Sequence, residues 1–508
     1  MAWRKNFSMI PGLLDYKVMH YLPRDIILYA ERTELLNTLK DGIIIYKDQG
    51  ADAYFPADQM TVYIKAVLEK IKHEPAWVRS IHEQCRKINK EYIAYARLVE
   101  SKDIGTLSNE EIIEMSARLS RLQIEGHLIA VSTTWFVDSD GELLAKHIIE
   151  KLKHDLSGYD DEELMRAYTV LTTPSEQNFS QAEETDFLRL ALTIGKDAYT
   201  KNIFDTKKGI EARFETMAEE RRSLLIEHYK KWRWTPYTYV GPAYHLEHYL
   251  YALADFFASG QDAASTLREA EERNEVIKEK QKQLLNRLPI SEQTGYFLGV
   301  ARDIIWLKDF RKYAMFYGFY CMDLLRKEAA RRLCVSLTQI NHLTEEEFNR
   351  ALKSGHMDTH IVNERRAFSV LSYIDGRQNI LTGEAAEFFV QSLEFEKELE
   401  SDADELQGSC ACPGDIVAKV KVVNTVAEMD KMNEGDIMLA HTTFPSLLPA
   451  MRKAGAIVTE DGGVTCHAAI VSRELNIPCV VGVKNVTRLL ADGDKVRVDA
   501  THGKVERL

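Results

Sequence analysis

The sequence predicts a multidomain protein with a large, mainly α-helical N-terminal domain, which contains a small β-hairpin, and a C-terminal α/β domain. Its 508 residues are more than one ordinary hydrophobic core organises. Apolar residues recur at helical spacing up to about residue 395. Strands then alternate with short helices to the end of the chain. We therefore expect domains over residues 1–395 and 408–508, joined by an acidic linker over residues 396–407.

The helices of the N-terminal region are predicted from apolar periodicity and start signals. In residues 58–71, DQMTVYIKAVLEKI, the apolar positions follow the spacing of one helix face. Capping boxes predict further helix starts at Ser108/Glu111, Ser180/Glu183 and Thr344/Glu347. Residues 42–55, GIIIYKDQGADAYF, are the exception and predict a β-hairpin that turns at Asp-Gln-Gly.

The C-terminal region has the alternation of strands and short helices that is typical of a small α/β domain. We predict strands in DIVAKVKVV, EGDIMLA, GAIVT and IPCVVGV. Residues 442–455 predict a short helix that ends at Gly455. The last sixteen residues, GDKVRVDATHGKVERL, predict a hairpin that turns near His502 and Gly503.

Composition narrows the class of protein. Hydrophobic residues make up 45% and charged residues 28%, which is typical of a soluble globular protein. A net charge of −13 without a Lys/Arg block argues against nucleic-acid binding, and no apolar run is long enough to span a membrane. Seven scattered cysteines predict reduced thiols and a cytoplasmic protein. Cys410 and Cys412 lack a second ligand pair for zinc, so we expect no metal site.

One histidine, His467, lies in the unusual stretch GGVTCHAAIVSRE. Gly462 and Gly463 allow a ligand to approach the backbone, and Thr465 is a plausible N-cap for a helix that begins beside His467. The N–H groups and dipole of a helix start favour a phosphate group, and a neutral imidazole is a competent nucleophile toward phosphorus. From spacing alone, a structural histidine remains the commoner interpretation of such a pattern.

The same stretch resembles the phosphohistidine segment of the PEP-utilising enzymes, the swivelling domain shared by pyruvate, water dikinase, pyruvate phosphate dikinase and rifampin phosphotransferase. The similarity continues through NIPCVVG, GSCACPGDIVAKVKVV, HTTFPSLLPAMRKAGAIVTEDGG and DGDKVRVDATHGKVERL, about a hundred residues in all. The resemblance implies that residues 408–508 form a swivelling domain and that His467 is the phosphorylated residue. The supporting residues that it implies are Gly462, Gly463, Thr465, Cys466 and Arg473.

Two modules that often accompany this segment have no counterpart in the pattern of the sequence. The region upstream lacks the glycine-rich strands and loops of an ATP-grasp domain, and no PEP/pyruvate barrel follows. We therefore expect no tightly bound cofactor on this chain, with ATP and Mg²⁺ held by a separate ATP-grasp subunit.

The first 400 residues more weakly resemble the helical middle part of rifampin phosphotransferase, which implies a binding domain for a small-molecule acceptor. The stretches that carry this similarity are LLIEHYKKWRWTPYTYVGPAYHLEHYL, WLKDFRKYAMFYGFYCMDLL and FSVLSYIDGRQNILTGEAAEFF.

Two groups of side chains are candidates for the acceptor site. An aromatic group crowds around Pro236, Gly241 and Pro242 and consists of Trp232, Trp234, Tyr237, Tyr239, Tyr244 and Tyr249. The acceptor candidates among them are Trp234, Tyr237, Tyr239 and Tyr244. It predicts either an aromatic pocket or, as the favoured alternative, packing between helices. A basic group beside Trp306 contains Lys308, Arg311 and Lys312. It predicts either a site for phosphate or an acidic acceptor, or a solvated helix face. The candidate bases are His228, His356 and His360, and an i, i+3 pair that would need a third ligand to bind metal is His245 with His248.

Together these features predict a phosphotransferase component of the dikinase type. His467 would carry a phosphoryl group from ATP on the separate subunit to an acceptor in the helical domain. The alternative hypothesis is a phosphorelay or regulatory protein whose helical domain binds a protein partner. An enclosed polar and aromatic pocket that faces His467 would favour the enzyme, whereas a flat helical surface would favour the relay.

Overall fold

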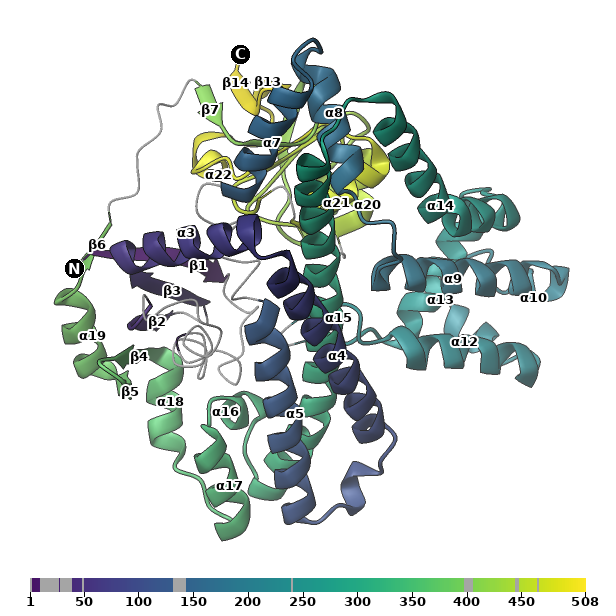
Figure 1. Ribbon diagram of the computed structural model, residues 1–508. Coiled ribbons are helices and arrows are strands. Elements are labelled where there is room, and N and C mark those ends of the chain that lie inside the picture. The colour runs from purple at the N-terminus through teal and green to yellow at the C-terminus, as the bar shows by residue number, and fades with distance from the viewer. Residues whose placement is uncertain are drawn as a thin grey trace.

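The protein combines a helical body with two β-sheets (Figure 1). The computed structural model describes residues 2–9, 27, 39–47, 50–130, 143–238, 241–396, 405–443, 447–463 and 466–508. The prediction of a large helical N-terminal region and a C-terminal domain that contains strands is confirmed. No helix in the described ranges has both the length and the apolar character needed to cross a bilayer.

One long helix, α15 (Glu292–Leu333, 42 residues), organises the helical body. At 1.5 Å per residue it is about 63 Å long, and it runs through the middle of the molecule in Figure 1. Its neighbours include α4, α5, α7, α8 and α9. The other helices of this region are α3 (Ala57–His73), α4 (Pro75–Glu100), α5 (Asn109–Ala130), α7 (Leu143–Asp155), α8 (Asp161–Thr172), α9 (Phe179–Gly195), α10 (Ala198–Asn202), α11 (Ile210–Phe214), α12 (Glu219–Trp232), α13 (Leu246–Ala258), α14 (Ala263–Arg287), α16 (Leu337–Asn341), α17 (Glu345–Ser354), α18 (Thr359–Ala367) and α19 (Gly383–Gln391), with a 3₁₀ turn at Ile104–Thr106.

Most of the predicted helix starts are correct. Helix α3 buries the expected apolar face, which consists of Met60, Ile64, Val67, Leu68 and Ile71. The capping box at Thr344 opens α17 as predicted. The prediction at Ser180 is wrong, because α9 begins two residues earlier. There Asn178 and Gln181 form the capping box, so an amide pair replaces the Ser/Glu pair that the sequence pattern favoured.

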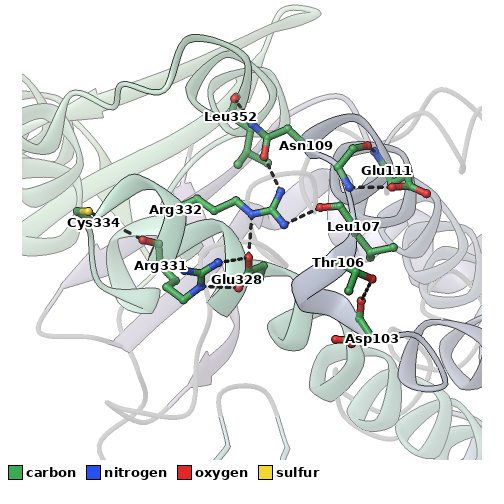
Figure 2. Close-up of polar contacts among 11 residues, drawn as sticks. Asp103, Thr106, Leu107, Asn109, Glu111, Glu328, Arg331, Arg332, Cys334 and Leu352 are labelled. Carbon is green, nitrogen blue, oxygen red and sulfur yellow. Dashed lines mark hydrogen bonds and ion pairs between the residues drawn. The ribbon is translucent and has the colours of Figure 1, made fainter.

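Figure 2 shows how the C-terminal end of α15 is fastened to the start of α5. The predicted Ser108/Glu111 box is present, with Ser108 Oγ accepting from Glu111 N at 3.1 Å and Glu111 Oε2 accepting from Ser108 N at 2.7 Å. Arg332 of α15 donates to Asn109 Oδ1 at 2.7 Å and to the Leu107 carbonyl oxygen at 2.6 Å. The Arg332 guanidinium thus donates to the residues before and after Ser108, and these hydrogen bonds fix α15 against the start of α5.

The predicted hairpin belongs to a six-stranded sheet, which the sequence did not predict. Strands β2 (Gly42–Lys47) and β3 (Gly50–Pro56) pair antiparallel, as expected. They are flanked by β1 (Ala2–Met9), β4 (Phe368–Ile374), β5 (Arg377–Thr382) and β6 (Glu394–Phe395), in the order β5-β4-β2-β3-β1-β6. The segment FSVLSYIDGRQNIL, which we grouped with the helical region, is therefore a second hairpin. Its turn at Asp375 and Gly376 has positive φ at both residues, as a two-residue hairpin loop requires.

The C-terminal domain is an eight-stranded sheet with short helices, in the order β7-β14-β13-β9-β10-β11-β12-β8. Strands β9, β10, β11 and β12 run parallel to one another and are flanked by the antiparallel strands β13 and β8. The closing hairpin β13–β14 turns where predicted. Its elements are β7 (Glu405–Gln407), β8 (Ser409–Cys412), β9 (Asp415–Val422), a 3₁₀ helix (Val426–Lys431), β10 (Ile437–Ala440), α20 (Leu448–Lys453), β11 (Ala456–Thr459), α21 (His467–Leu475), β12 (Cys479–Val481), α22 (Val486–Leu489), β13 (Lys495–Asp499) and β14 (Lys504–Arg507).

The linker predicted over residues 396–407 and the helix predicted over residues 442–455 have other boundaries in the structure. Residues 405–407 of the expected linker form β7, which pairs with β14 and so belongs to the C-terminal sheet. Residues 397–404 of that linker lie outside the described residues. Within the predicted 442–455 helix, α20 begins at Leu448 and ends at Lys453, with Ala454 rather than Gly455 next to its end as the C-cap.

Candidate active site

His467 is the first residue of α21, as predicted. The helix follows β11 and leads into β12, which lies parallel to β11. His467 is therefore presented beyond the carboxyl end of a parallel strand, where open α/β sheets bind their ligands. Its N-cap is Cys466, whose side chain caps no backbone N–H, and Cys466 N donates to the Gly463 carbonyl oxygen at 2.9 Å. Thr465, the predicted N-cap, lies outside the described residues.

The glycine turn before the helix leaves no room for a side chain. Gly462 has φ +110°, and a Cβ there would lie 2.9 Å from both Cβ and Sγ of Cys466. Gly462 is therefore required by the turn itself, which Cys466 crowds, and the approach of a ligand to this backbone stays a prediction.

The loop that carries Gly462 is tied to the neighbouring strand end. His441, just after β10, contacts Asp461 with Nε2 3.2 Å from Oδ2, and this hydrogen bond raises the pKa of His441 above its ordinary value. The backbone of Asp461 also donates to the His441 carbonyl oxygen at 2.8 Å. These contacts hold the loops after β10 and β11 side by side.

Thr443 orients the imidazole of His467. Its Oγ1 lies 2.9 Å from Nδ1 of His467, and its side chain is buried, with 5% of its surface exposed. A hydroxyl that accepts from Nδ1–H fixes the tautomer in which Nε2 carries the lone pair. With the Thr443 hydroxyl as acceptor, Nε2 is the ring nitrogen with the free lone pair, whereas a hydroxyl that donates to Nδ1 would place the ring proton on Nε2.

The surroundings keep this imidazole neutral. Burial lowers the pKa of His467 to about 3, and the charge of Lys312 on α15 contributes to the lowering. The residue as a whole retains intermediate exposure. A neutral ring with a free Nε2 lone pair is the nucleophilic form at neutral pH.

The helical body contacts α21 directly. Gln181 of α9 donates to Glu474 Oε1 at 2.6 Å, and Arg452 of α20 contacts Glu184 of α9 at 3.3 Å. Burial raises the pKa of Glu474 to about 7, against the opposing effect of Arg273. The C-terminal domain is therefore docked against the helical domain, with its histidine helix at the contact.

A pocket lies at this contact, between the N-terminal end of α9, α15 and α21. Its lining includes Asn178, Gln181, Trp306, Asp309, Arg473 and Glu474. Burial raises the pKa of Asp309 to about 6, opposed by Lys312 and by a hydrogen bond from the Phe179 backbone N–H. The pocket therefore combines an aromatic wall with charged groups from both domains.

The residues predicted to support His467 lie around α21. Arg473 donates from Nε to the Ala411 carbonyl oxygen of β8 at 2.8 Å. Its two terminal nitrogens are buried and have no hydrogen-bond partner within the described ranges. Cys466 has a free thiol whose pKa is raised by burial. Gly463 contributes the carbonyl oxygen that accepts from Cys466.

The aromatic candidates for the acceptor site lie inside the helical body. Trp234 is 2% exposed and stacks on Tyr313 of α15, with ring centroids 5.0 Å apart. Tyr237 is also buried and donates its hydroxyl to Asp323. Tyr244 stacks on His248 with centroids 3.6 Å apart, and burial raises its pKa to about 12. Tyr239 is outside the described residues.

The basic side chains of α15 that were candidates for the acceptor site have different neighbours. Arg311 Nη1 lies 2.8 Å from His127 Nδ1 of α5, so it faces the interior of the helical body. Lys312 instead influences Cys466 and His467, and Lys308 contributes to the charge around Cys466. The basic group identified in the sequence thus has one member, Lys312, whose charge acts on the histidine.

The histidines and cysteines that raised the question of metal form no cluster. Within the described ranges no group of three or more His, Cys, Asp and Glu side chains is placed to hold a metal ion. His248 has its pKa lowered to about 4 by burial, next to its stacking partner Tyr244. Of the candidate bases, His228 is buried against Tyr249, and His356 and His360 are exposed.

Comparison with known proteins identifies the C-terminal domain. Residues 432–503 match the mobile domain of the PEP-utilising enzymes. The resemblance seen in the sequence is thereby confirmed for this segment. His467 and Thr443 both lie within it.

Curated relatives match over the same part of the chain. A probable phosphoenolpyruvate synthase of Archaeoglobus fulgidus is 49% identical over 115 residues, which cover 22% of this chain and 15% of the relative. One from Methanothermobacter thermautotrophicus is 46% identical over 110 residues, covering 22% and 16%. The phosphoenolpyruvate synthase of Pyrococcus furiosus is 52% identical over 100 residues, covering 20% and 12%. The matches thus span between 12% and 16% of the length of these relatives.

Among solved structures, the holo-form of aconitase X from Thermococcus kodakaraensis matches at 23% identity. It covers 20% of this chain and 98% of that chain with a TM-score of 0.17. A likeness of that size carries no argument about fold or function.

Three site residues escaped the sequence argument. Thr443 was noticed only as part of HTTFPSLLPAMRKAG, and nothing in that pattern shows that its hydroxyl meets His467. Asp309 and Gln181 come from helices distant in sequence from α21, and only the docking of the two domains brings them to it.

Proposed function

We propose that this chain is a phosphotransferase component of the dikinase type, in which His467 carries a phosphoryl group. The observation that carries the proposal is the contact between Thr443 Oγ1 and His467 Nδ1, at the start of a helix in a PEP-utilising mobile domain. It leaves a neutral imidazole with its Nε2 lone pair free. The names of the relatives, phosphoenolpyruvate synthases, support phosphoryl transfer as the chemistry.

The first step forms a bond between Nε2 and phosphorus and breaks the bond between that phosphorus and its leaving oxygen in ATP. No proton need leave the ring, because Nδ1–H stays hydrogen-bonded to Thr443 while the ring takes on positive charge. The product is a phosphoimidazolium whose phosphoryl charge lies near the N–H groups that begin α21. Transfer to the acceptor reverses this bond change and returns a neutral imidazole.

ATP and Mg²⁺ belong, in this proposal, to a separate ATP-grasp subunit. Mg²⁺ there would neutralise charge on the transferring phosphoryl group. The C-terminal domain would leave the docked position to reach that subunit and return with phosphohistidine. The contacts that it must release include the Gln181–Glu474 hydrogen bond and the Arg452–Glu184 ion pair, the second of which is partly exposed and so costs little to break.

The alternative, a phosphorelay protein that docks a protein partner on a flat helical surface, is less well supported. The pocket between α15 and α21 is polar and aromatic, and it includes Trp306, Asp309 and Glu474. Its lining reaches Ile470 of α21 but not His467, so it supports a small acceptor only by its polar and aromatic chemistry beside the histidine helix.

The test is incubation of the chain with ATP labelled on its β and γ phosphates and with an ATP-grasp protein encoded beside it. The expected product is acid-labile, base-stable label that is absent from His467→Ala and present in His502→Ala. His502 is the matched control because it lies in the same domain, on the closing hairpin, hydrogen-bonded to Asp499. Equal labelling of the wild type and His467→Ala would eliminate His467 as the carrier.

A further inference from the structure

Helix α15 presents a charged pair to the histidine helix. Asp309 and Lys312 are one turn apart on α15, so they share a face. The charge of Lys312 acts on both Cys466 and His467, and Asp309 lines the pocket beside Ile470, Arg473 and Glu474 of α21. The pocket that Asp309 lines therefore follows α21 from Ile470 to Glu474, and Ile470 is one helical turn beyond His467.

Asp309 has one satisfied and one unsatisfied oxygen. Its carboxylate accepts from the Phe179 backbone N–H at the start of α9. Its Oδ2 is buried and has no hydrogen-bond partner among the residues that the structure describes. A buried carboxylate oxygen without a donor costs free energy, and it is suited to accept a proton from a ligand that enters the pocket.

We propose that Asp309 accepts the proton of an acceptor hydroxyl during the transfer from phospho-His467. This inference rests on the proposed function and names its second half-reaction. The hydroxyl oxygen forms a bond to phosphorus as the bond between phosphorus and Nε2 breaks. The hydroxyl proton passes to Asp309 Oδ2, and His467 leaves as neutral imidazole with Nδ1–H still held by Thr443.

The acceptor class follows from the proton that Asp309 Oδ2 can take. A carboxylate acceptor brings no proton for Oδ2, and although the buried terminal nitrogens of Arg473 would attract it, ionised Asp309 would repel it. A hydroxyl brings both the proton and a nucleophilic oxygen. The structure therefore favours an alcohol, phenol or enol over a carboxylic acid.

The ionisation of Asp309 suits this role. Burial raises its pKa to about 6, while Lys312 and the Phe179 N–H act in the opposite direction. The other charged groups that face it are Glu474 and Arg473 on α21, with Glu176 at the pocket rim. A carboxyl with a pKa near 6 is ionised at neutral pH and can still accept a proton in the transition state.

The experiment loads His467 with phosphoramidate as the donor and follows the loss of phosphate to water, which is the smallest hydroxyl acceptor. Rates are measured from pH 5 to 8 and divided by those of the same phosphoprotein unfolded in urea. For the wild type we expect this ratio to rise as the pH passes about 6, because Asp309 becomes ionised. Asp309→Asn should load normally, lose phosphate at least about tenfold more slowly, and show no such rise.

Two further variants complete the test. Lys312→Gln should move the rise to higher pH, because its charge lowers the pKa of Asp309. Asp303→Asn is the control on the same helix, since Asp303 is about half exposed and contacts His82; it should behave as wild type.

The outcomes separate the two proposals. If phosphoramidate gives no His467-dependent label, the proposed function fails and this inference falls with it. If label forms but Asp309→Asn releases phosphate with the wild-type rate and pH profile, Asp309 is not the base. A flat wild-type ratio between pH 5 and 8 would overturn the inference even if the variant did not fold.

Discussion

Replacement of Lys312 by Met tests whether the two domains dock in solution as they do in the structure. The pKa of His467 is lowered from 6.5 to about 3 by two causes, of which burial is the larger and the charge of Lys312 the smaller. Lys312 thus accounts for less than half of the difference of about 3.5, that is, for less than about 1.7. We expect Lys312→Met to raise the pKa of His467 by about one, which corresponds to about 1.4 kcal/mol of electrostatic interaction.

The assay is an NMR titration of the chain with isotope-labelled histidine, in which His467→Gln identifies the resonance. Lys327→Met is the matched control, because Lys327 is exposed on the same helix at a site away from α21. It should leave the pKa of His467 unchanged. A change below about 0.3 in Lys312→Met would refute the placement of Lys312 beside the imidazole. A wild-type pKa near 6.5 would refute the burial of the ring itself.

Three further predictions concern the residues around α21. Thr443→Val should slow phosphorylation of His467 by about tenfold or more while Thr443→Ser restores it, because only the hydroxyl fixes the tautomer; initial rates of labelling measure this. Gly462→Ala should lower the free energy of unfolding in urea by about 1–3 kcal/mol, since φ is +110° and Cβ would meet Cys466 at 2.9 Å. Gly493→Ala, with φ +97° and open space around it, should cost less, and an equal cost would contradict the crowding. Glu474 binds a proton more tightly when docked, with a pKa of about 7 against 4.5, so docking strengthens as the pH falls from 7 toward 4.5. Glu474→Gln should flatten this dependence, as measured by amide hydrogen exchange at the start of α9, and an unchanged slope would exclude Glu474 as its source.

The sequence predicted those helices and helix starts whose signal lies within a few neighbouring residues. The apolar spacing from Met60 to Ile71, the capping box at Ser108 and the helix that begins at His467 all appear as expected. Each depends on residues within a few positions of one another. The turn at Asp375 and Gly376 was equally readable, because Asp-Gly between alternating apolar residues is a strong hairpin signal.

What could not be predicted depends on contacts between distant segments. The six-stranded sheet joins β1 near the start of the chain to β6 near residue 395, and a register of that kind has no local signature. The same holds for the site. Gln181, Asp309 and Lys312 are ordinary residues of helical patterns until the C-terminal domain docks against them. The sequence thus located the proposed nucleophile, and only the tertiary structure located the groups that lie around it.

The most direct test of the account is the chemical identity of the phosphorylated residue after reaction with labelled ATP and the ATP-grasp protein. We predict one phosphate per chain on Nε2 of His467, stable in base and lost in acid, with Nδ1 unmodified because Thr443 occupies it. Phosphate found on a serine, threonine or aspartate, or on Nδ1 of His467, would contradict the central claim that Thr443 leaves Nε2 as the nucleophile.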